Sequence, residues 1–153
     1  MSDDELERAV ERLQRKCGET SAEWGPLVVE ASTVSRFREA VGLPTADALG
    51  VVPPTLLFNL SRTKVDVHRD ARPQESLDEH LGNPVNGGSA YQWFRPVRVG
   101  ETVSARVTLK SADLRAAKSG PLAIVVSETS VFDTARQCVA VLAQTIIYRG
   151  GVS

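Results

Sequence analysis

Hydrophobic and polar positions follow two different periods in the two halves of the chain. In the first 17 residues the period is helical: apolar side chains recur every three or four residues, at Leu6, Ala9, Val10, Leu13 and Cys17. This spacing places them on one face of an amphipathic helix. Acidic residues begin the segment and basic residues end it, the order that the helix dipole favours. The pattern predicts an N-terminal helix over residues 3–17.

Residues 20–42 predict a short strand and a second helix. "ETSAEWG" is interpreted as a break after the first helix, and the apolar "PLVVEA" over residues 26–31 as a strand. Ser32 or Thr33 then serves as the predicted cap of a helix that ends near Gly42. In this helix Phe37, Ala40 and Val41 are expected to face inward.

Residues 43–84 are predicted to hold one apolar helix between two irregular segments. Three prolines and a glycine make residues 43–54 a loop, because proline removes a backbone donor and restricts the residue before it. "PTLLFNLSR" fits a helix that begins at Pro54. The polar and turn-rich residues 63–84 are predicted to form a surface excursion.

The last 65 residues change to a period of two. Four runs, at 89–97, 102–113, 121–132 and 137–148, are predicted to be strands separated by turns. Val103, Ala105, Val107 and Leu109 alternate with polar residues, so one face of that strand is expected to be buried. Ile124 is expected to be buried too, in a more continuously apolar strand. The order of elements predicts an α+β fold, with an antiparallel sheet wrapped around a central apolar helix and an extra helix at the N-terminus.

Composition excludes several functional classes. The chain has 153 residues with 18 basic and 19 acidic side chains, so it has no net positive charge to hold nucleic acid or an anionic membrane. Cys17 and Cys138 show neither metal-type spacing nor an obvious pairing, and both are expected to be reduced. The charged N-terminus and the absence of a long apolar run predict a cytoplasmic protein with no signal peptide or membrane span. The sequence contains no cofactor motif, so no cofactor is expected.

Five stretches in order carry a resemblance to a known family. They are "WGPLVVEASTVSRFREAVG", "PPTLLF", "FRPVRVGETVSARV", "KSGPLAIVVSETSVFD" and "QTIIYR", spread over residues 20–149. Together they resemble the MaoC-like branch of the hot-dog superfamily, in its N-terminal, non-catalytic-half form. "RPVRVGE" is similar to the RP-x-x-x-GD turn of that family. The resemblance implies a hot-dog domain over residues 20–153, preceded by the helix of residues 1–19.

Active relatives are (R)-specific enoyl-CoA hydratases and 3-hydroxyacyl dehydratases, whose active site resembles G-D-x-N-P-x-H. The reaction needs an aspartate and a histidine that share one water and exchange protons. Aligning that motif with "GLPTADA" sets Leu43 at the aspartate and Ala48 at the histidine. Neither side chain exchanges a proton, so the resemblance implies that this stretch lacks the chemistry of the family. Asp47 lies beside the histidine position and is a candidate substitute, although it is also a common turn residue.

The other candidate residues lie later in the chain. His68 and His80 are the two histidines, and both belong to the polar excursion, where a solvated charged surface is the alternative to acid/base work. No zinc-type spacing predicts a metal. Asn86 occupies a place where relatives show a histidine, and with the glycines after it offers an oxyanion-type site for a thioester carbonyl. The alternative is an ordinary glycine-rich strand start.

The expected substrate-binding residues are Pro54, Thr55, Asn86 and Gly87. The aromatic residues Tyr91, Trp93 and Phe94 are predicted to be core or interface.

Three functional hypotheses remain open on the sequence. The first is a non-catalytic subunit that pairs with a catalytic MaoC-like protomer in an acyl-thioester hydratase or dehydratase. The second is a homodimeric accessory protein that binds an acyl or polyketide-like group without turnover. The third is an enzyme with relocated acid and base residues. In the first two the partners are an acyl-CoA or acyl carrier protein thioester and a second hot-dog protomer, joined edge to edge.

Overall fold

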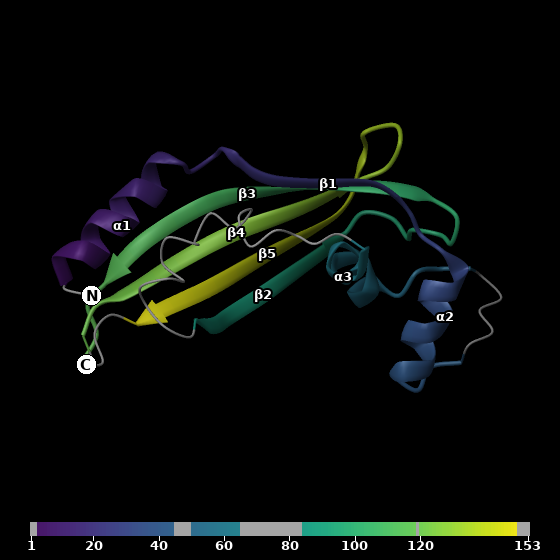
Figure 1. The fold of residues 1–153 in the computed structure, drawn as a ribbon, viewed down its shortest axis with the longest axis horizontal. Coiled ribbons are helices and arrows are strands. Elements are labelled where there is room, and N and C mark those ends of the chain that lie inside the picture. The colour runs from purple at the N-terminus through teal and green to yellow at the C-terminus, as the bar shows by residue number, and fades with distance from the viewer. Residues whose placement is uncertain (1–2, 45–49, 65–83, 119, 150–153) are drawn as a thin grey trace.

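The computed structural model describes residues 3–44, 50–64, 84–118 and 120–149. Within these ranges the elements follow the order helix, strand, two helices and four strands (Figure 1). They are α1 (Asp3–Arg15), β1 (Thr20–Val28), α2 (Ala31–Ala40), α3 (Pro54–Lys64), β2 (Val85–Trp93), β3 (Thr102–Arg115), β4 (Leu122–Phe132) and β5 (Cys138–Arg149). In this part of the chain no helix is both long and apolar enough to cross a membrane.

The five strands form one antiparallel sheet in the order β1-β3-β4-β5-β2. The α+β class and the last three strands are therefore as predicted, whereas β2 spans Val85–Trp93 and so begins and ends four residues before the predicted strand 89–97. β1 begins at Thr20, so the expected break at "ETSAEWG" is wrong. The strand tolerates a glycine and a proline because the β1–β3 register shifts between Trp24 and Leu27, and a bulge accommodates residues that a regular ladder rejects.

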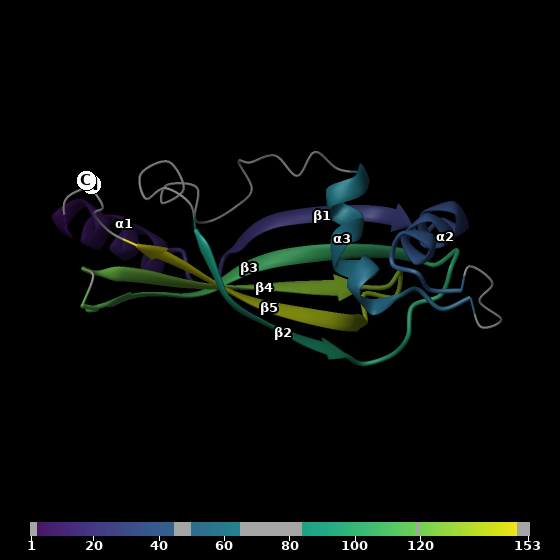
Figure 2. The same cartoon turned by 90° about the horizontal axis from the view of Figure 1, so that it is seen from below.

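One half of the sheet packs on α3. Leu56, Leu57 and Leu60 of this helix are buried with side chains from every strand except β2. Figure 2 shows α3 lying across the end of the sheet at which α2 also lies. The sequence produces this arrangement because the apolar residues of α3 meet the alternating apolar positions of the strands, such as Val103 and Ala105, which are 1% and 3% exposed.

The other half of the same sheet face packs on α1. Leu6, Ala9, Val10 and Leu13 of α1 are all buried, in a second cluster with Leu109, Ala112, Ala123, Val125 and Tyr148. The predicted amphipathic face is therefore the one that the sheet covers. Since α1 supplies buried side chains to the sheet, it adds to the core, and the division into residues 1–19 and 20–153 stays a prediction.

Two predicted facings are wrong. Ile124 is only half-buried, whereas its neighbours Ala123 and Val125 are buried, because the apolar run of β4 gave no alternation from which to choose a face. In α2, Val34 is buried while Ala40 and Val41 are exposed. This helix spans Ala31–Ala40 with Glu30 at its N-cap and Val41 at its C-cap, so the cap predicted at Ser32 or Thr33 is wrong, and Ala40 and Val41 lie at the end of the helix, past the turn that packs on the core. Phe37 is partly buried against the core, as expected.

Candidate binding site

An apolar pocket of about 280 Å³ lies where α3 begins and β2 ends. Almost all of its lining is hydrocarbon, supplied by Val51, Val52, Pro54, Leu57, Trp93, Arg95, Pro96 and Val97. We call it the apolar pocket. Its volume is near the lower end of the range of about 300–1,000 Å³ for ligand pockets, so it suits part of a ligand better than a whole one.

Backbone hydrogen bonds hold the two walls of the apolar pocket together. The Val52 N–H donates to the Val97 carbonyl over 2.8 Å, and the Val99 N–H donates to the Gly50 carbonyl over 2.7 Å. Val51 and Arg98 form an isolated antiparallel bridge. Segment 50–52 therefore lies as a short extra strand along segment 97–99.

Three aromatic side chains stand beside the apolar pocket. Tyr91 and Trp93 of β2 stack with a centroid distance of 5.4 Å and an interplanar angle of 8°. Phe58 of α3 contacts both rings at 5.4 and 6.2 Å. Tyr91 and Trp93 are 45% and 41% exposed, and Phe94, which follows β2, is 55% exposed. The predicted core role of Tyr91, Trp93 and Phe94 is therefore wrong, and their predicted interface role stays open.

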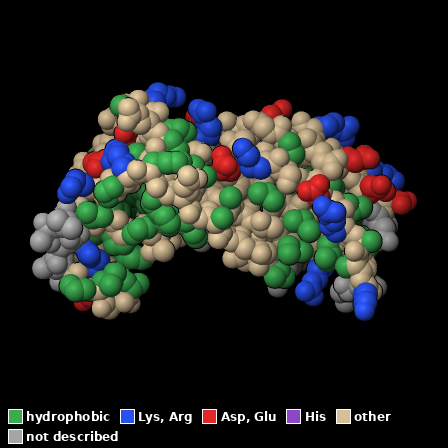
Figure 3. Space-filling view, turned by 180° about the vertical axis from the view of Figure 1, so that it is seen from behind, with side chains coloured by type: hydrophobic (Ala, Val, Ile, Leu, Met, Phe, Trp, Pro, Cys, Tyr) green, Lys and Arg blue, Asp and Glu red, His purple; other side chains and the backbone are tan. Residues whose placement is uncertain are grey.

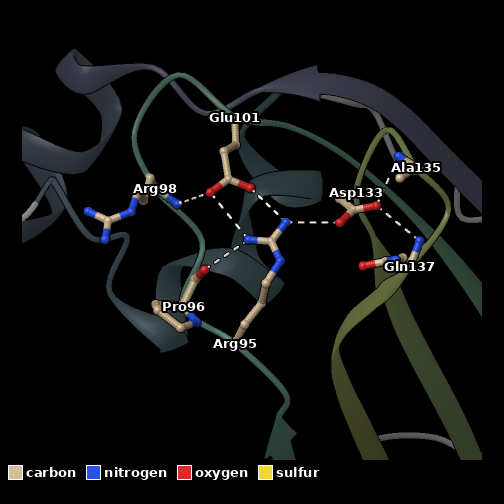
Figure 4. Close-up of polar contacts among 7 residues, drawn as sticks. All are labelled: Arg95, Pro96, Arg98, Glu101, Asp133, Ala135 and Gln137. Atoms are coloured by element: carbon tan, nitrogen blue, oxygen red, sulfur yellow. Dashed lines mark hydrogen bonds and ion pairs between the residues drawn. The ribbon is translucent and has the colours of Figure 1, made fainter.

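Arg95, which lines the apolar pocket, is also the centre of an ion-pair cluster (Figure 4). Arg95 Nη2 lies 2.9 Å from Glu101 Oε2 and 3.0 Å from Asp133 Oδ2. The hydrogen bond from Arg95 lowers the pKa of both carboxyls below their ordinary values, and backbone N–H donors add to this effect. The Arg95 pKa is raised, chiefly by its hydrogen bond to Glu101. All three side chains are therefore held in their charged forms.

The start of β2 contains the predicted oxyanion residues. The Gly88 N–H donates to Asn86 Oδ1 over 3.0 Å, and the β2–β5 register shifts between these residues. A Cβ at Gly87 would lie 2.9 Å from the Ile147 side chain, so a larger residue there would require that side chain to shift. Trp93 follows Asn86 by seven residues, which is about 23 Å along a strand.

The predicted substrate-binding residues therefore occupy separate places within one protomer. Pro54 lines the apolar pocket, and Thr55 follows it as an exposed residue whose carbonyl accepts a hydrogen bond from Asn59. Asn86 and Gly87 lie at the opposite end of β2. Leu43 is 44% exposed after α2.

Asp47, Ala48, His68 and His80 lie outside the described residues. Among the residues that the structure describes, no group of three or more acidic, histidine or cysteine side chains is arranged to hold a metal.

Sequence reasoning missed Trp93, Arg95 and Val97 as parts of the site. One signal was present: Arg95 begins the "RPVRVGE" turn and Glu101 ends it, a spacing that permits an ion pair across the turn. The apolar pocket itself gives no sequence signal, because its walls come from segments about 40 residues apart.

A second, larger cavity lies on the opposite face of the sheet. It has a volume of about 570 Å³, and β1, β3 and the loop after β4 line it. Its Arg106 is paired with Glu23 at 2.9 Å and lies 6.0 Å from the Phe132 ring centre. Figure 3 views the molecule from behind, where charged and hydrophobic side chains mix. Because Arg106 and Glu23 satisfy each other and the lining is mixed, this cavity indicates no ligand class, and the apolar pocket is the better candidate site.

Comparison with known proteins identifies the family. The chain belongs to the family described as FAS1-like, dehydratase domain region, whose model matches residues 15–142. It is thus a MaoC-like hot-dog protein with the predicted α+β hot-dog fold. No curated protein matches the sequence significantly.

Several solved structures share the fold. The ChsH1-ChsH2 complex from Mycobacterium tuberculosis contains a chain with a TM-score of 0.75 and 14% identity, and the match covers 99% of this chain and 95% of that one. A MaoC-like dehydratase has a TM-score of 0.67 at 19% identity, with 90% and 43% covered. The C-terminally truncated HadBC (3R-hydroxyacyl-ACP dehydratase) complex from Mycobacterium tuberculosis has a TM-score of 0.57 at 20% identity, with 82% and 94% covered. At these identities the likeness establishes the fold.

Proposed function

We propose that this protein is an acyl-thioester-binding, non-catalytic subunit of an (R)-specific enoyl-CoA hydratase or 3-hydroxyacyl-thioester dehydratase. The observation that carries the proposal is an apolar pocket that opens beside β2, which is an edge strand and exposed along its length among the described residues. The pocket suits an acyl chain, and the edge suits a second hot-dog protomer.

The lining of the apolar pocket favours binding over proton transfer. Arg95 is its one ionisable residue, and that guanidinium is engaged by Glu101 and Asp133. Each methylene group of an acyl chain that moves from water to such a surface contributes about 0.8 kcal/mol of favourable free energy to binding. The apolar residues at the two proton-handling positions, Leu43 and Ala48, agree with a protomer that binds and does not react.

The two edges of the sheet differ in their capacity to pair. β1 is interrupted by two register shifts and contains Pro26. Bulges and prolines prevent natural edge strands from pairing with another chain. β2 contains no proline and no charged residue, and its register is continuous from Gly88 to Trp93. An exposed edge of this kind is suited to hydrogen-bonding with another strand, so the predicted edge-to-edge partner is expected at β2.

Pairing at β2 also accounts for the separated site residues. In a two-fold antiparallel arrangement centred near Ser89, Asn86 of the partner subunit lies opposite Gln92, next to Trp93 and the apolar pocket. The start of β2 from one protomer then approaches the α3 start of the other. Pro54 and Asn86, which are distant in one chain, would contribute to one composite site. Two of the similar structures, ChsH1-ChsH2 and HadBC, are complexes, which agrees with this arrangement.

The test is to measure hydration of a short trans-2-enoyl-CoA by this chain alone, and by this chain mixed with a catalytic MaoC-like protomer that carries G-D-x-N-P-x-H. A general acid or base contributes about 10²–10⁴-fold, so the chain alone is expected to show only background activity. The mixture should be active, and more active than the catalytic protomer by itself. Asp47→Ala in this chain should leave the activity of the mixture unchanged.

Turnover by the isolated chain that disappears in Asp47→Ala or His80→Ala would contradict the proposal and favour an enzyme with relocated residues. A homodimeric accessory protein is the second candidate, because an uncharged β2 edge repels no second copy of itself. Retained acyl-CoA binding by a stable homodimer that does not associate with the catalytic protomer would favour that candidate.

A further inference from the structure

Arg95 braces its own turn, residues 95–101, and joins it to Asp133, which lies 38 residues further along the chain. Its Nη1 donates to Glu101 Oε1 over 3.3 Å and its Nη2 to Glu101 Oε2 over 2.9 Å, a bidentate pair across the turn after β2. Nη2 also donates over 3.0 Å to Asp133 Oδ2, in the loop between β4 and β5. Nη1 further donates to the Pro96 carbonyl over 2.9 Å. Figure 4 shows the guanidinium between the two carboxylates.

Both carboxylates are fixed by the backbone as well as by Arg95. Glu101 Oε1 accepts the Arg98 N–H over 2.8 Å. Asp133 Oδ1 accepts the N–H groups of Ala135 and Gln137, each over 2.9 Å. Arg95 thus meets acceptors already held in place, and a planar guanidinium matches such a pair in a way that a lysine ammonium does not.

The turn that Arg95 fixes forms one wall of the apolar pocket, and its backbone is hydrogen-bonded to segment 50–52, which forms the other wall. Pro96 and Val97 line the pocket directly. The carbonyl of Val97 and the N–H of Val99 hold segment 50–52 through the two backbone bonds described above. The same turn is tied to the end of β1, where the Gly100 N–H donates to the Val29 carbonyl over 2.8 Å.

We propose that Arg95 is a positioning residue of the apolar pocket: it sets the separation of segments 50–52 and 96–97, and so the fit of the acyl chain. This inference rests on the proposed function. The side chains of Arg95 and Glu101 are 38% and 28% exposed, and pairs this accessible contribute little to global stability. Val52 and Val97, at 4% and 3% exposure, keep the region folded. Losing Arg95 should therefore change the geometry of the pocket more than the stability of the fold.

The experiment compares the wild-type chain with Arg95→Met, Arg95→Lys and Glu101→Gln, with Arg106→Met as the matched control. Arg106 also pairs with a carboxylate, but in the second cavity. Two readouts are used: hydrogen exchange of the Val52 and Val99 amides, and the change in Trp93 fluorescence on titration with octanoyl-CoA. Trp93→Phe assigns the signal, because the other tryptophan, Trp24, is buried at 8% exposure.

Arg95→Met is expected to weaken octanoyl-CoA binding about tenfold through loss of a preorganised wall, and to speed exchange of both amides with little change in melting temperature. Arg95→Lys should recover part of the affinity, Glu101→Gln should resemble Arg95→Met, and Arg106→Met should match wild type. Unchanged exchange and affinity in Arg95→Met and Glu101→Gln would overturn the inference, and so would uniformly faster exchange over the whole chain. If the wild type binds no octanoyl-CoA while exchange still rises at Val52 and Val99, the proposed function fails and the positioning role stands.

Discussion

At the scale of single residues, Glu101 and Asp133 give the protein a defined response to acid. Arg95 lowers the pKa of both carboxyls in the folded state, so their contribution to stability is complete above their ordinary values of 4.5 and 3.8. That contribution disappears as the pH falls through the lowered values, because protonation removes the acceptor charge that Arg95 binds.

Urea denaturation at pH 7 and pH 3 tests this response. Glu101→Gln should be only slightly less stable than wild type at pH 7, because an ion pair this accessible contributes little, and this small difference in free energy of unfolding should shrink at pH 3. Arg106→Met serves as a control for general charge effects. A difference that is equal at the two pH values would show that Glu101 acts by its shape and not by its charge.

The stability of the fold depends on the burial of Leu109. It is 1% exposed beneath α1, and an unpaired charge there costs several kcal/mol against a total stability of about 5–15 kcal/mol. Leu109→Asp should therefore unfold the domain or prevent soluble expression, whereas Leu114→Asp, at a 37% exposed position of the same strand, should melt close to wild type. Circular dichroism melting checks both.

Individual side chains show why the sequence predicted the core better than the site. The burial of Leu109 followed from strict alternation in β3. Ile124 was misplaced because β4 is apolar on both faces. Tyr91 and Trp93 are large and apolar, so composition assigned them to the core, yet edge position leaves them exposed. Pro54 lines the apolar pocket, while its role in substrate binding stays a prediction, and the wall opposite it comes from a distant turn that no local pattern identifies.

At the scale of elements, α1 stabilises the sheet as a structural part and is more than an appended helix. Leu13 is 2% exposed in the second core cluster, and truncation of a buried leucine typically costs about 2–5 kcal/mol. Leu13→Ala should lower the melting temperature clearly, while Arg12→Ala, at the exposed neighbouring position, should not. Equal melting of the two variants would mean that α1 is a separate, dispensable unit.

The boundary of an element was predicted correctly where a residue within that element determines it, and wrongly where contacts with another element determine it. α3 was predicted from Pro54 onward because proline suits the first turn of a helix. β1 was predicted too short because its length is set by pairing with β3, including Thr20 with Thr108, and such pairing is not visible in the strand itself. The predicted facing of α2 failed because the helix ends at Ala40, and its buried side is set by the packing of Val34 and Phe37 on the core, which no local pattern identifies.

At the scale of the whole molecule, the uncharged edge of β2 predicts association. Tyr91→Asp should convert a dimer to a monomer in sedimentation velocity, because both strands of a symmetric pair would carry the new charge close to the junction. Val28→Asp is the matched control: Val28 is 48% exposed but lies on β1, so this variant should stay dimeric. A compact monomer of the wild type at micromolar concentration would contradict pairing at β2.

In the proposed assembly through β2, the bulges and proline of β1 have a second consequence, because they limit how many copies can join. A sheet with two open edges can add copies without limit and grow into a filament, as a contact that does not close on itself does. Here the irregular backbone of β1 prevents pairing at that edge. Pairing at β2 therefore leaves no regular edge free among the described strands. Repairing β1, for instance by replacing Pro26 with a strand-forming residue, is therefore the substitution that would turn a finite pair into a growing fibre.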